Sequence, residues 1–298
     1  MEIYGERNKK RYMAKKIAAL IVLYEPEKES FTLTYNALAL QVDGFCIVDN
    51  SKENHSQWFD NSNNVIYIPL QENVGIASAQ NIGIKALMKA DYEMILFSDQ
   101  DSIASPDLVE KLYSAHNLLK SNDIPIATLG CYAVDKATGI QYSSKNIIKK
   151  ETINIEGRKF TVVDYLRCSM TLTDIRVLNE VGGMDETLFI DGVDCEWCWR
   201  AFDKNNKKTI LVEDAFIYHS IGHGSHKVIN RLVTIPSSFR LFYQYRNYLW
   251  LIRRNYVPMR WKVRNGFKYI VKIPYYSLFC SPRVRNLKNI VNGIIAGI

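Results

Sequence analysis

Two aspartates, Asp99 and Asp101, stand one residue apart at the end of the apolar run Leu96-Phe97-Ser98. Alternate side chains of an extended segment share a face, so both carboxylates are expected to converge just beyond the strand end. A hard divalent cation such as Mg²⁺ or Mn²⁺ takes one or two protein carboxylates and completes its shell with water and substrate phosphates. The pair therefore predicts a metal-bridged diphosphate. The alternative is a helix N-cap, because Ser102–Pro106 is typical of a helix start and Asp is favoured there.

Short apolar runs alternate with helix-like stretches around this pair. The apolar runs predict strands at Ile17–Tyr24, Phe45–Asp49, Val65–Pro69 and Glu93–Ser98. The stretches between them predict helices at Phe31–Gln41, Ile76–Ala90 and Ser105–Lys120. Strands that alternate with helices indicate a parallel sheet covered by helices on both faces. In such sheets ligands bind beyond the carboxyl ends of the strands.

Polar residues follow these strand ends. The first strand is followed by Tyr24-Glu25-Pro26, the second by Asp49-Asn50-Ser51, and the fourth by the Asp99–Ser102 segment that contains Gln100. After the third strand comes Gln71–Gly83, in which small residues let a helix approach a ligand closely. We therefore expect a ligand pocket at this edge of the sheet.

The order of these motifs resembles the nucleotide-sugar half of inverting family 2 glycosyltransferases. The motifs are Tyr-x-Pro, Val-Asp-Asn-Ser, Glu-Asn-x-Gly-x-Ala-x-Ala-x-Asn-x-Gly and Asp-x-Asp, and the match continues at Gly182–Glu186, Phe189–Arg200 and His219–Gly222. The pattern is most similar to that of the rhamnosyltransferases of bacterial surface polysaccharide assembly, and it extends from about Lys16 to Arg254. The resemblance implies an α/β protein with the GT-A fold, in which a Rossmann-like mixed sheet with helices on both faces is followed by basic C-terminal helices.

The resemblance also implies a donor site. Asp49 would accept a hydrogen bond from the imide N–H of a uracil or thymine base. Asp99 and Asp101 would hold the ion on the diphosphate. The other expected contacts of the nucleotide sugar are Tyr24, Glu25, Asn73, Gly75, Asn81 and Gln100, together with Asp99 itself. The alternative interpretation of Asp49 is a turn residue in Asp-Asn-Ser.

Inverting transfer needs a base that removes the proton of the attacking sugar hydroxyl. In the family this base is the Asp of a Glu-Asp pair shortly before an Arg, which matches Val193-Asp194 and Arg200 here, although Val193 departs from the pattern. We therefore expect Asp194 to be the base and Asp191 to be the second candidate. On a helix that begins near Gly192, Asp191 would be the N-cap and Asp194 would lie in the first turn. The alternative is that these acids, with Glu196, only complement the helix dipole.

Other residues are expected to serve the acceptor or the ion. Trp197 is expected to pack or to stack on an acceptor sugar, and Arg200 and Arg246 are expected to meet the acceptor or a diphosphate. Arg240 and the pair Arg253-Arg254 are further candidates for a diphosphate. His219 follows a predicted strand over Thr209–Tyr218, and in this fold a histidine in that region can be a further metal ligand; the alternative is a histidine with a structural hydrogen bond.

Composition is that of a folded enzyme with a catalytic domain and an appendage. The chain has 298 residues, of which 47% are hydrophobic and 23% are charged. We expect a basic N-terminal segment at 1–16, a catalytic domain at 17–230 and a basic, aromatic-rich helical region at 231–298. Residues 1–16 contain no apolar stretch, so we expect no secretory signal and six reduced thiols, and we treat Cys195-x-x-Cys198 as a coincidence.

Charge is concentrated at the end of the chain. From Ala215 to Ile298 there are 14 Lys or Arg residues and no acidic residue, while the rest of the chain carries 24 basic and 31 acidic residues, a net charge of −7. Fifteen of the 35 aromatic residues lie in the same segment, many of them in Phe239–Arg254, where Leu241, Tyr245 and Leu249 recur at helical spacing. A basic aromatic helix suits the surface of an anionic membrane, and no run approaches the roughly 18 apolar residues of a spanning helix. The alternative is packing on the catalytic domain or in a homodimer.

The sequence thus predicts an inverting, metal-dependent glycosyltransferase. We expect it to move L-rhamnose from dTDP-L-rhamnose to a lipid-linked saccharide on the inner face of the bacterial cell membrane, in the cytoplasm, with Mg²⁺ or Mn²⁺ as cofactor. A UDP-hexose or UDP-galactofuranose donor is the alternative within the same fold. A non-catalytic nucleotide-binding scaffold and a nucleic-acid-binding protein are alternatives of another class, and we expect no nucleic-acid partner because nothing in the chain resembles a nucleic-acid motif.

Overall fold

The computed structural model describes residues 16–59, 64–135, 149–219, 225–228, 231–234 and 236–298. For residues 135, 149, 150, 219, 225–228 and 231–234 it describes the backbone alone. The basic segment expected at 1–16 therefore lies outside the described residues, apart from Lys16.

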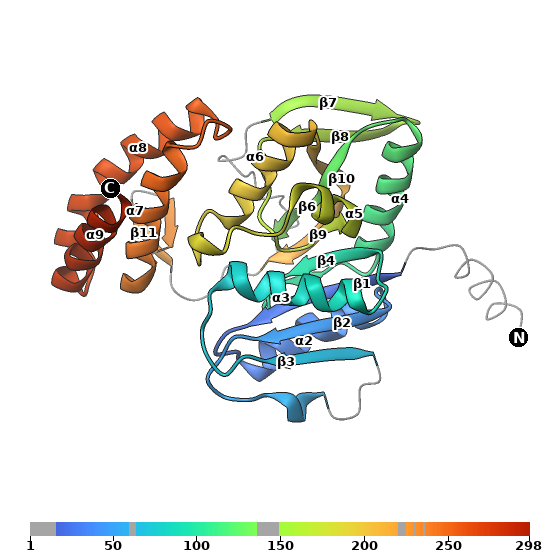
Figure 1. Cartoon of the computed structure of the whole chain (residues 1–298), viewed down its shortest axis with the longest axis horizontal. Coiled ribbons are helices and arrows are strands. Elements are labelled where there is room, and N and C mark those ends of the chain that lie inside the picture. The colour runs from blue at the N-terminus through green and yellow to red at the C-terminus, as the bar shows by residue number, and fades with distance from the viewer. Residues whose placement is uncertain (1–15, 60–63, 136–148, 220–224, 229–230, 235) are drawn as a thin grey trace, which may run out of the picture.

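One mixed sheet forms the centre of the part of the chain that precedes the C-terminal helices (Figure 1). Its strands are β1 Ile17–Leu23, β2 Gly44–Asp49, β3 Val65–Pro69, β4 Met94–Ser98, β5 Ile103–Ala104, β6 Ile126–Asp135, β7 Lys149–Ile155, β8 Arg158–Val163, β9 Thr171–Asp174 and β10 Lys208–His219. They lie in the order β3-β2-β1-β4-β9-β6-β10-β8-β7, with β5 paired to β10. The strands β3, β2, β1 and β4 are parallel, and the antiparallel β9 next to β4 makes the sheet mixed.

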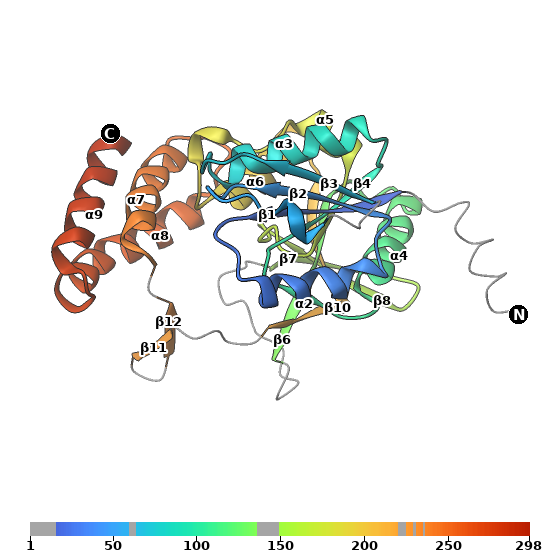
Figure 2. The same cartoon turned by 90° about the horizontal axis from the view of Figure 1, so that it is seen from below.

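Helices cover both faces of the sheet, as the sequence predicted. They are α2 Lys28–Ala39, α3 Ile76–Lys89, α4 Leu108–Ser121, α5 Ile175–Val181 and α6 Val193–Asn205, with the short turns η1 Ser56–Trp58 and η2 Glu186–Leu188. Figure 2 shows α2 and α3 on opposite sides of the strands. Because the central strands are covered on both sides, their sequences are nearly continuous apolar runs instead of alternating ones.

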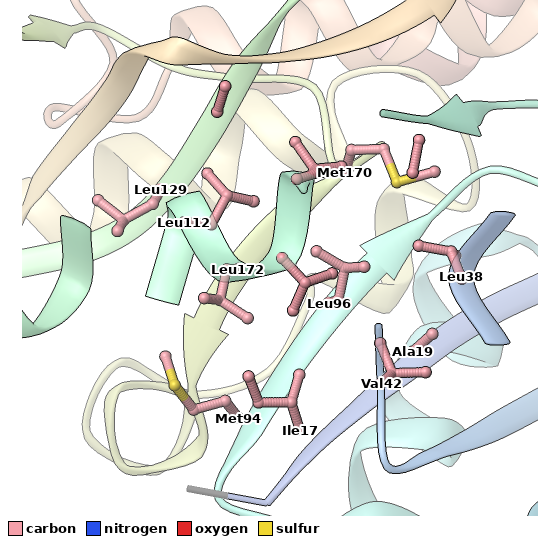
Figure 3. Packing of buried hydrophobic residues seen from close by; sticks show 14 of the residues in the cluster. Ile17, Ala19, Leu38, Val42, Met94, Leu96, Leu112, Leu129, Met170 and Leu172 are labelled. Carbon is pink, nitrogen blue, oxygen red and sulfur yellow. The ribbon is translucent and has the colours of Figure 1, made fainter. Parts of the chain in front are cut away.

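Successive residues of β1 point into two different cores. Ile17, Ala19 and Ile21 pack with residues of α2 and α4, in the cluster that Figure 3 shows with Leu38 and Leu112. Ala18 and Leu20 pack with residues of α3, α5 and α6. A Cβ atom on Gly83 of α3 would lie 2.2 Å from Leu20, so a glycine is needed for the close approach of this helix to the sheet. This approach sets the beginning of α3 beside the strand ends.

A group of C-terminal helices lies beside α6 (Figures 1 and 2). The helices are α7 Ser238–Ile252, α8 Met259–Pro274 and α9 Arg283–Gly297, with the π-helical turn η3 Tyr275–Phe279, and a hairpin of β11 Ser225–Val228 and β12 Arg231–Thr234 precedes them. Leu241 and Tyr245 of α7 are buried against Ile290 of α9. The apolar stripe of α7, which we expected to lie on a membrane, is therefore an interior surface.

Two further expectations concern thiols and membrane spans. All six cysteines lie among the described residues and are free thiols, so Cys195-x-x-Cys198 forms no disulfide. Within the described residues, no helix combines the length and the apolar character that crossing a bilayer requires.

Candidate active site

Asp99 and Asp101 lie in the turn that follows β4. The Asp99 backbone N–H donates to Ser169 Oγ at 3.2 Å, which ties this turn to the segment before β9. Helix α4 begins only at Leu108, with Asp107 as its N-cap residue, and β5 lies between. The alternative in which Asp99 or Asp101 caps a helix is therefore wrong, and the two carboxylates remain available for a ligand.

The Asp99 carboxyl group lies close to other acids. Although Asp99 is exposed at the surface, the surrounding protein displaces much of the water from its carboxyl group, and the charges of Asp194 and Asp101 lie nearby. Together these effects raise the pKa of Asp99 to about 6. Neighbouring carboxylates that raise the pKa of Asp99 fit a divalent cation, because the cation removes their repulsion. The residues present thus suit the ion that the sequence predicted.

Asp194 is held by the segment before β9. Its carboxylate accepts hydrogen bonds from the backbone N–H and the thiol of Cys168, and with Cys168 and Arg167 it lines a cavity of about 10 Å³. Burial raises the pKa of Asp194, opposed by these hydrogen bonds and by the charge of Arg167. A carboxylate with a raised pKa is a stronger base than an exposed one, which suits proton removal. The fold thus brings Asp194 to the Asp99 turn from a position 95 residues later in the sequence.

The start of α6 differs from the prediction. Gly192, in the left-handed conformation with φ 95°, occupies the N-cap position, and no side chain caps the helix there. The expectation that Asp191 is the N-cap is therefore wrong. Asp191 has φ 64°, and its carboxylate forms a two-bonded ion pair with Arg240 of α7, at 2.5 Å and 3.1 Å. Asp191 thus joins the catalytic domain to the C-terminal helices.

Asn247 of α7 fixes the same turn. Its side-chain amide is 1% exposed and lies 2.8 Å, 2.7 Å and 2.8 Å from the carbonyl oxygens of Leu188, Ile190 and Asp191. The sequence analysis missed this residue. The available signal was an asparagine in the interior of a predicted helix, where it is a weak helix former. Arg167, Cys168 and Ser169 were also missed, because no motif marks them.

The strand ends contact one another as expected. The side-chain amide of Gln100 accepts from the Tyr24 N–H at 2.9 Å and donates to the Tyr24 carbonyl at 3.3 Å. The Glu25 N–H donates to Ser51 Oγ at 2.9 Å. Tyr24 itself is half exposed. These bonds join the loops after β1, β2 and β4 into one surface.

The Asp49 carboxylate, which was expected to contact a uracil or thymine base, is fully buried in this structure. The carboxylate accepts from Tyr67 Oη at 2.5 Å, from His55 Nδ1 at 2.7 Å and from the Ser51 N–H at 3.1 Å. Burial alone would raise its pKa, but the hydrogen bonds from Tyr67, His55 and Ser51 hold it below the usual value. The carboxylate is therefore engaged by the protein, as in the alternative of a turn residue, and its contact with a uracil or thymine base stays a prediction.

Asn73 and Asn81 organise loops. Asn73 Oδ1 accepts from Asn50 Nδ2 at 2.9 Å and from the Gly75 N–H at 3.0 Å, which shapes the loop before α3. Asn81 Oδ1 accepts from the Met184 N–H at 2.7 Å, and its amide donates to the Met184 carbonyl at 2.9 Å. Asn81 is 9% exposed, so this tether, and not the lining of an open pocket, is its role in the structure. Gly75 has φ 85°, and a Cβ there would lie 2.5 Å from Phe189.

Three residues expected to contact the acceptor have structural partners. Trp197 is 3% exposed and donates from its indole to the Gly182 carbonyl, so it cannot stack on a sugar. Arg200 binds Glu196 with two bonds and donates to the carbonyls of Val181 and Gly183. Arg246 lies over aromatic rings of α7 and donates to the carbonyls of Thr187 and Leu188. The structure thus shows the packing role that was expected for Trp197 as one of two possibilities. Backbone carbonyls that no motif reveals are partners of Arg200 and Arg246, and a contact of these two arginines with an acceptor stays a prediction.

Glu196 is the centre of this structural network. It is 1% exposed and accepts from Arg200 Nε at 2.8 Å and from Tyr256 Oη at 2.6 Å, with Arg254 at 3.3 Å. Removing one partner of a buried ion pair leaves an uncompensated charge. We expect Glu196→Gln to lower the free energy of unfolding by about 3 kcal/mol, measured by urea denaturation.

The control for this change is Glu180→Gln. Glu180 pairs with Lys207 at 2.7 Å but is half exposed, so its loss should cost less than about 1 kcal/mol. If Glu196→Gln also lowers the free energy of unfolding by less than about 1 kcal/mol, the assignment of a buried network is contradicted.

His219 ends β10, where its backbone pairs with Asp135 of β6. Its side chain lies outside the described part of the structure, so its expected role as a ligand stays a prediction. Among the residues described, no group of three His, Cys, Asp or Glu side chains forms a ready metal site. A cation on Asp99 and Asp101 would take other ligands from substrate phosphates and water, with His219 as the further protein ligand that stays a prediction.

Comparisons with known proteins agree with this geometry. The family model described as Glycosyl transferase family 2 matches residues 37–179. The dTDP-rhamnosyl transferase RfbF of Shigella flexneri is 33% identical over 257 residues, which are 85% of this chain and 85% of that protein.

Solved structures show the same fold. A structure titled S. aureus TarS 1-349 has a TM-score of 0.55 at 16% identity and is matched over 95% of this chain and 81% of its own. GalNAc-T7 with UDP, GalNAc and Mn²⁺ has a TM-score of 0.53 at 12% identity over 90% of this chain. The chain spans 49% of a longer TarS structure and 58% of GalNAc-T7.

Proposed function

Because this protein belongs to glycosyl transferase family 2 and has a GT-A fold, we propose that it transfers L-rhamnose from dTDP-L-rhamnose to a saccharide acceptor in bacterial surface polysaccharide synthesis. The observation that carries the donor assignment is the 33% identity to a dTDP-rhamnosyl transferase over 85% of both chains. The chemistry is supported by the convergence of Asp99, Asp101 and Asp194 at the strand ends.

In the proposed reaction Asp194 is the base. It takes the proton of the attacking acceptor hydroxyl while the bond between the anomeric carbon and the nucleotide diphosphate breaks on the opposite face, which inverts the anomeric configuration. Cys168 orients the Asp194 carboxylate through two hydrogen bonds. Asp99 and Asp101 would hold Mg²⁺ or Mn²⁺, which would neutralise the charge that develops on the departing diphosphate.

The test of this function is a donor screen. Release of dTDP or UDP is measured from a panel of nucleotide sugars with Mn²⁺ or Mg²⁺, in the presence of saccharide acceptors. We expect dTDP-rhamnose to be used with the highest kcat/KM. Preferential release of UDP from a UDP-hexose or UDP-galactofuranose would show that the donor assignment is wrong and would leave the assignments of the fold and of the catalytic base unchanged. No release from any donor would support a non-catalytic scaffold.

We further propose that α8 and α9 rest on the inner face of an anionic membrane, which would place the enzyme next to a lipid-linked acceptor. Exposed apolar side chains follow α8, η3 and α9: Met259, Val263, Phe267, Ile270, Val271, Leu278, Phe279, Val284, Leu287, Val291, Ile295 and Ile298. The chain carries no acidic residue after residue 214, so the charged side chains of these helices are all lysines and arginines. An apolar face beside cations is typical of interfacial helices.

Vesicle flotation tests the membrane proposal. Burying one large apolar side chain contributes about 1.5–3 kcal/mol, so the double change Phe267→Glu with Ile270→Glu should weaken binding to phosphatidylglycerol vesicles by at least about tenfold. The matched control is Leu33→Glu with Leu40→Glu on α2 and the turn after it, where both leucines are exposed. The membrane proposal is wrong if the wild-type protein does not float with vesicles but sediments as a dimer that Phe267→Glu dissociates. The apolar face would then be the contact with a second copy of the chain.

A further inference from the structure

A basic pocket lies between α8 and the segment that follows β8. It has a volume of about 180 Å³, and its lining includes Tyr165, Trp261, Arg264, Lys268, Tyr269 and Lys272. The α8 residues in this lining recur every three or four positions and thus form one helix face. The exposed apolar residues of α8, such as Val263, Phe267 and Ile270, lie on the opposite face. One helix therefore presents an apolar surface outward and a basic surface inward.

The pocket holds three cations in a row. Arg264, Lys268 and Lys272 are spaced four residues apart, so they rise about 6 Å each along the helix. Burial lowers the pKa of Lys268, and the charges of Arg264 and Lys272 lower it further. Burial also lowers the pKa of Lys272, although Asp191 opposes this. Like charges held together in a recess are stabilised by an anion, and an arginine with two lysines matches the oxygen atoms of phosphate groups.

The pocket is linked to the surroundings of Asp194 through the segment that follows β8, although its lining and that of the Asp194 cavity share no residue. Tyr165 stands two residues before Arg167 and three before Cys168, the residues that surround Asp194. From the other side, Asp191 and Cys195 act electrostatically on Tyr269, and Asp191 acts on Lys272. Asp191 lies in the turn before α6 and Cys195 in the first turn of α6, on either side of Asp194 in the sequence. A ligand anchored in the pocket would therefore lie next to the base.

We propose that the Arg264-Lys268-Lys272 pocket binds the phosphate or diphosphate ester of the acceptor and so places the acceptor sugar beside Asp194. This inference rests on the proposed function in one respect, that the acceptor carries its saccharide on a phosphate. The pocket would supply the diphosphate contacts that the sequence analysis expected of Arg240, Arg246 or the pair Arg253-Arg254. The aromatic rings of Tyr165 and Trp261 form the part of the wall that an acceptor sugar would contact.

The test is the double variant Arg264→Gln with Lys268→Gln. Its matched control is Arg260→Gln with Lys288→Gln, which removes the same charge from exposed positions outside the pocket. In transfer assays with a diphosphate-linked acceptor, we expect the pocket variant to raise the acceptor KM by about tenfold or more, because two charge-assisted contacts are lost. The donor KM and the slow hydrolysis of donor without acceptor should stay within about twofold. An unchanged acceptor KM would overturn the proposal.

A binding measurement separates the pocket from the proposed function. Inorganic pyrophosphate is titrated calorimetrically in buffer with EDTA, so that no divalent ion can bridge it to Asp99. We expect pyrophosphate to bind the wild type and the control. Its affinity should fall by about tenfold or more in the pocket variant and should be retained in Arg264→Lys with Lys268→Arg. If no donor is used but this pattern holds, the proposed function fails and the anion site stands. If pyrophosphate binds all variants equally, the pocket assignment fails.

Vesicles distinguish the acceptor from a membrane headgroup. Phosphatidylglycerol vesicles without acceptor should bind the pocket variant and the wild type equally well, because the pocket face of α8 points away from its apolar face. A selective loss of vesicle binding in the pocket variant, with the acceptor KM unchanged, would assign the site to lipid headgroups and overturn the proposal.

Discussion

Asp194→Asn should lower kcat by about 10²–10⁴, because general-base catalysis contributes rate factors of this size. Asparagine has the same shape and can still accept the hydrogen bonds of Cys168, but it cannot take a proton. The donor KM should change by no more than about threefold, since donor binding does not use this group. Transfer is measured as release of dTDP, with thermal unfolding to verify the fold.

The control lies on the same helix. Asp203→Asn removes one carboxylate from an exposed position of α6 and should leave kcat unchanged. Asp191→Asn should cost less than Asp194→Asn, because the Asp191 carboxylate is bound by Arg240. If Asp194→Asn retains full activity while Asp191→Asn loses it, Asp191 is the base.

A dependence on pH follows from the same assignment. Asp194 works only when deprotonated, and burial raises its pKa above the ordinary value for aspartate. The kcat of the wild type should therefore be at its maximum above this raised pKa and should fall as the pH is lowered through it. The residual rate of Asp194→Asn should lack this acidic limb, which a pH profile of kcat measures.

The second large effect concerns the ion. Treatment with EDTA should abolish transfer, and Mn²⁺ or Mg²⁺ should restore it, because the ion would carry the charge of the departing diphosphate. Asp99→Asn should lower kcat/KM for the donor by about 10²-fold or more, a loss of several kcal/mol of charge stabilisation. Asp107→Asn, at a half-exposed position before α4, is the control and should keep full activity.

Two results would contradict this role for Asp99. Transfer that continues in EDTA would remove the cation from the reaction. Transfer that needs the cation but is unaffected by Asp99→Asn would move the ion to other ligands, with Asp101 and His219 as the next to be tested.

The sequence was most reliable where the pattern is local. Buried strands such as β1 and β3 are short apolar runs between polar turns, and their bounds agree with prediction to within a residue. The placement of Asp99 and Asp101 follows from such a strand, because the chain direction fixes which end of the sheet they occupy. The order of several motifs identified the family, since each motif alone is too short to do so.

The roles of individual polar residues were less predictable. Arg200 and Asn81 match family motifs in spacing, yet their hydrogen bonds go to backbone groups of the 181–186 segment. A side chain bound in this way cannot also hold a substrate without breaking those bonds. Its partners come from a different part of the chain, 103 residues away for Asn81 and Met184, and no local pattern records them.

By itself the sequence determined the family, the mixed sheet with helices on both faces, the acids of the site and the basic character of the C-terminal helices. Only the tertiary structure decided that Asp194 and Asp99 lie together, that Asn247 and Arg240 of α7 hold the turn before α6, and that the inner face of α8 is a basic pocket. The physical reason is the distance along the sequence over which each kind of interaction acts. Strand and helix formation depends on neighbours in the chain, whereas hydrogen-bond satisfaction and desolvation depend on which distant segments the fold packs together.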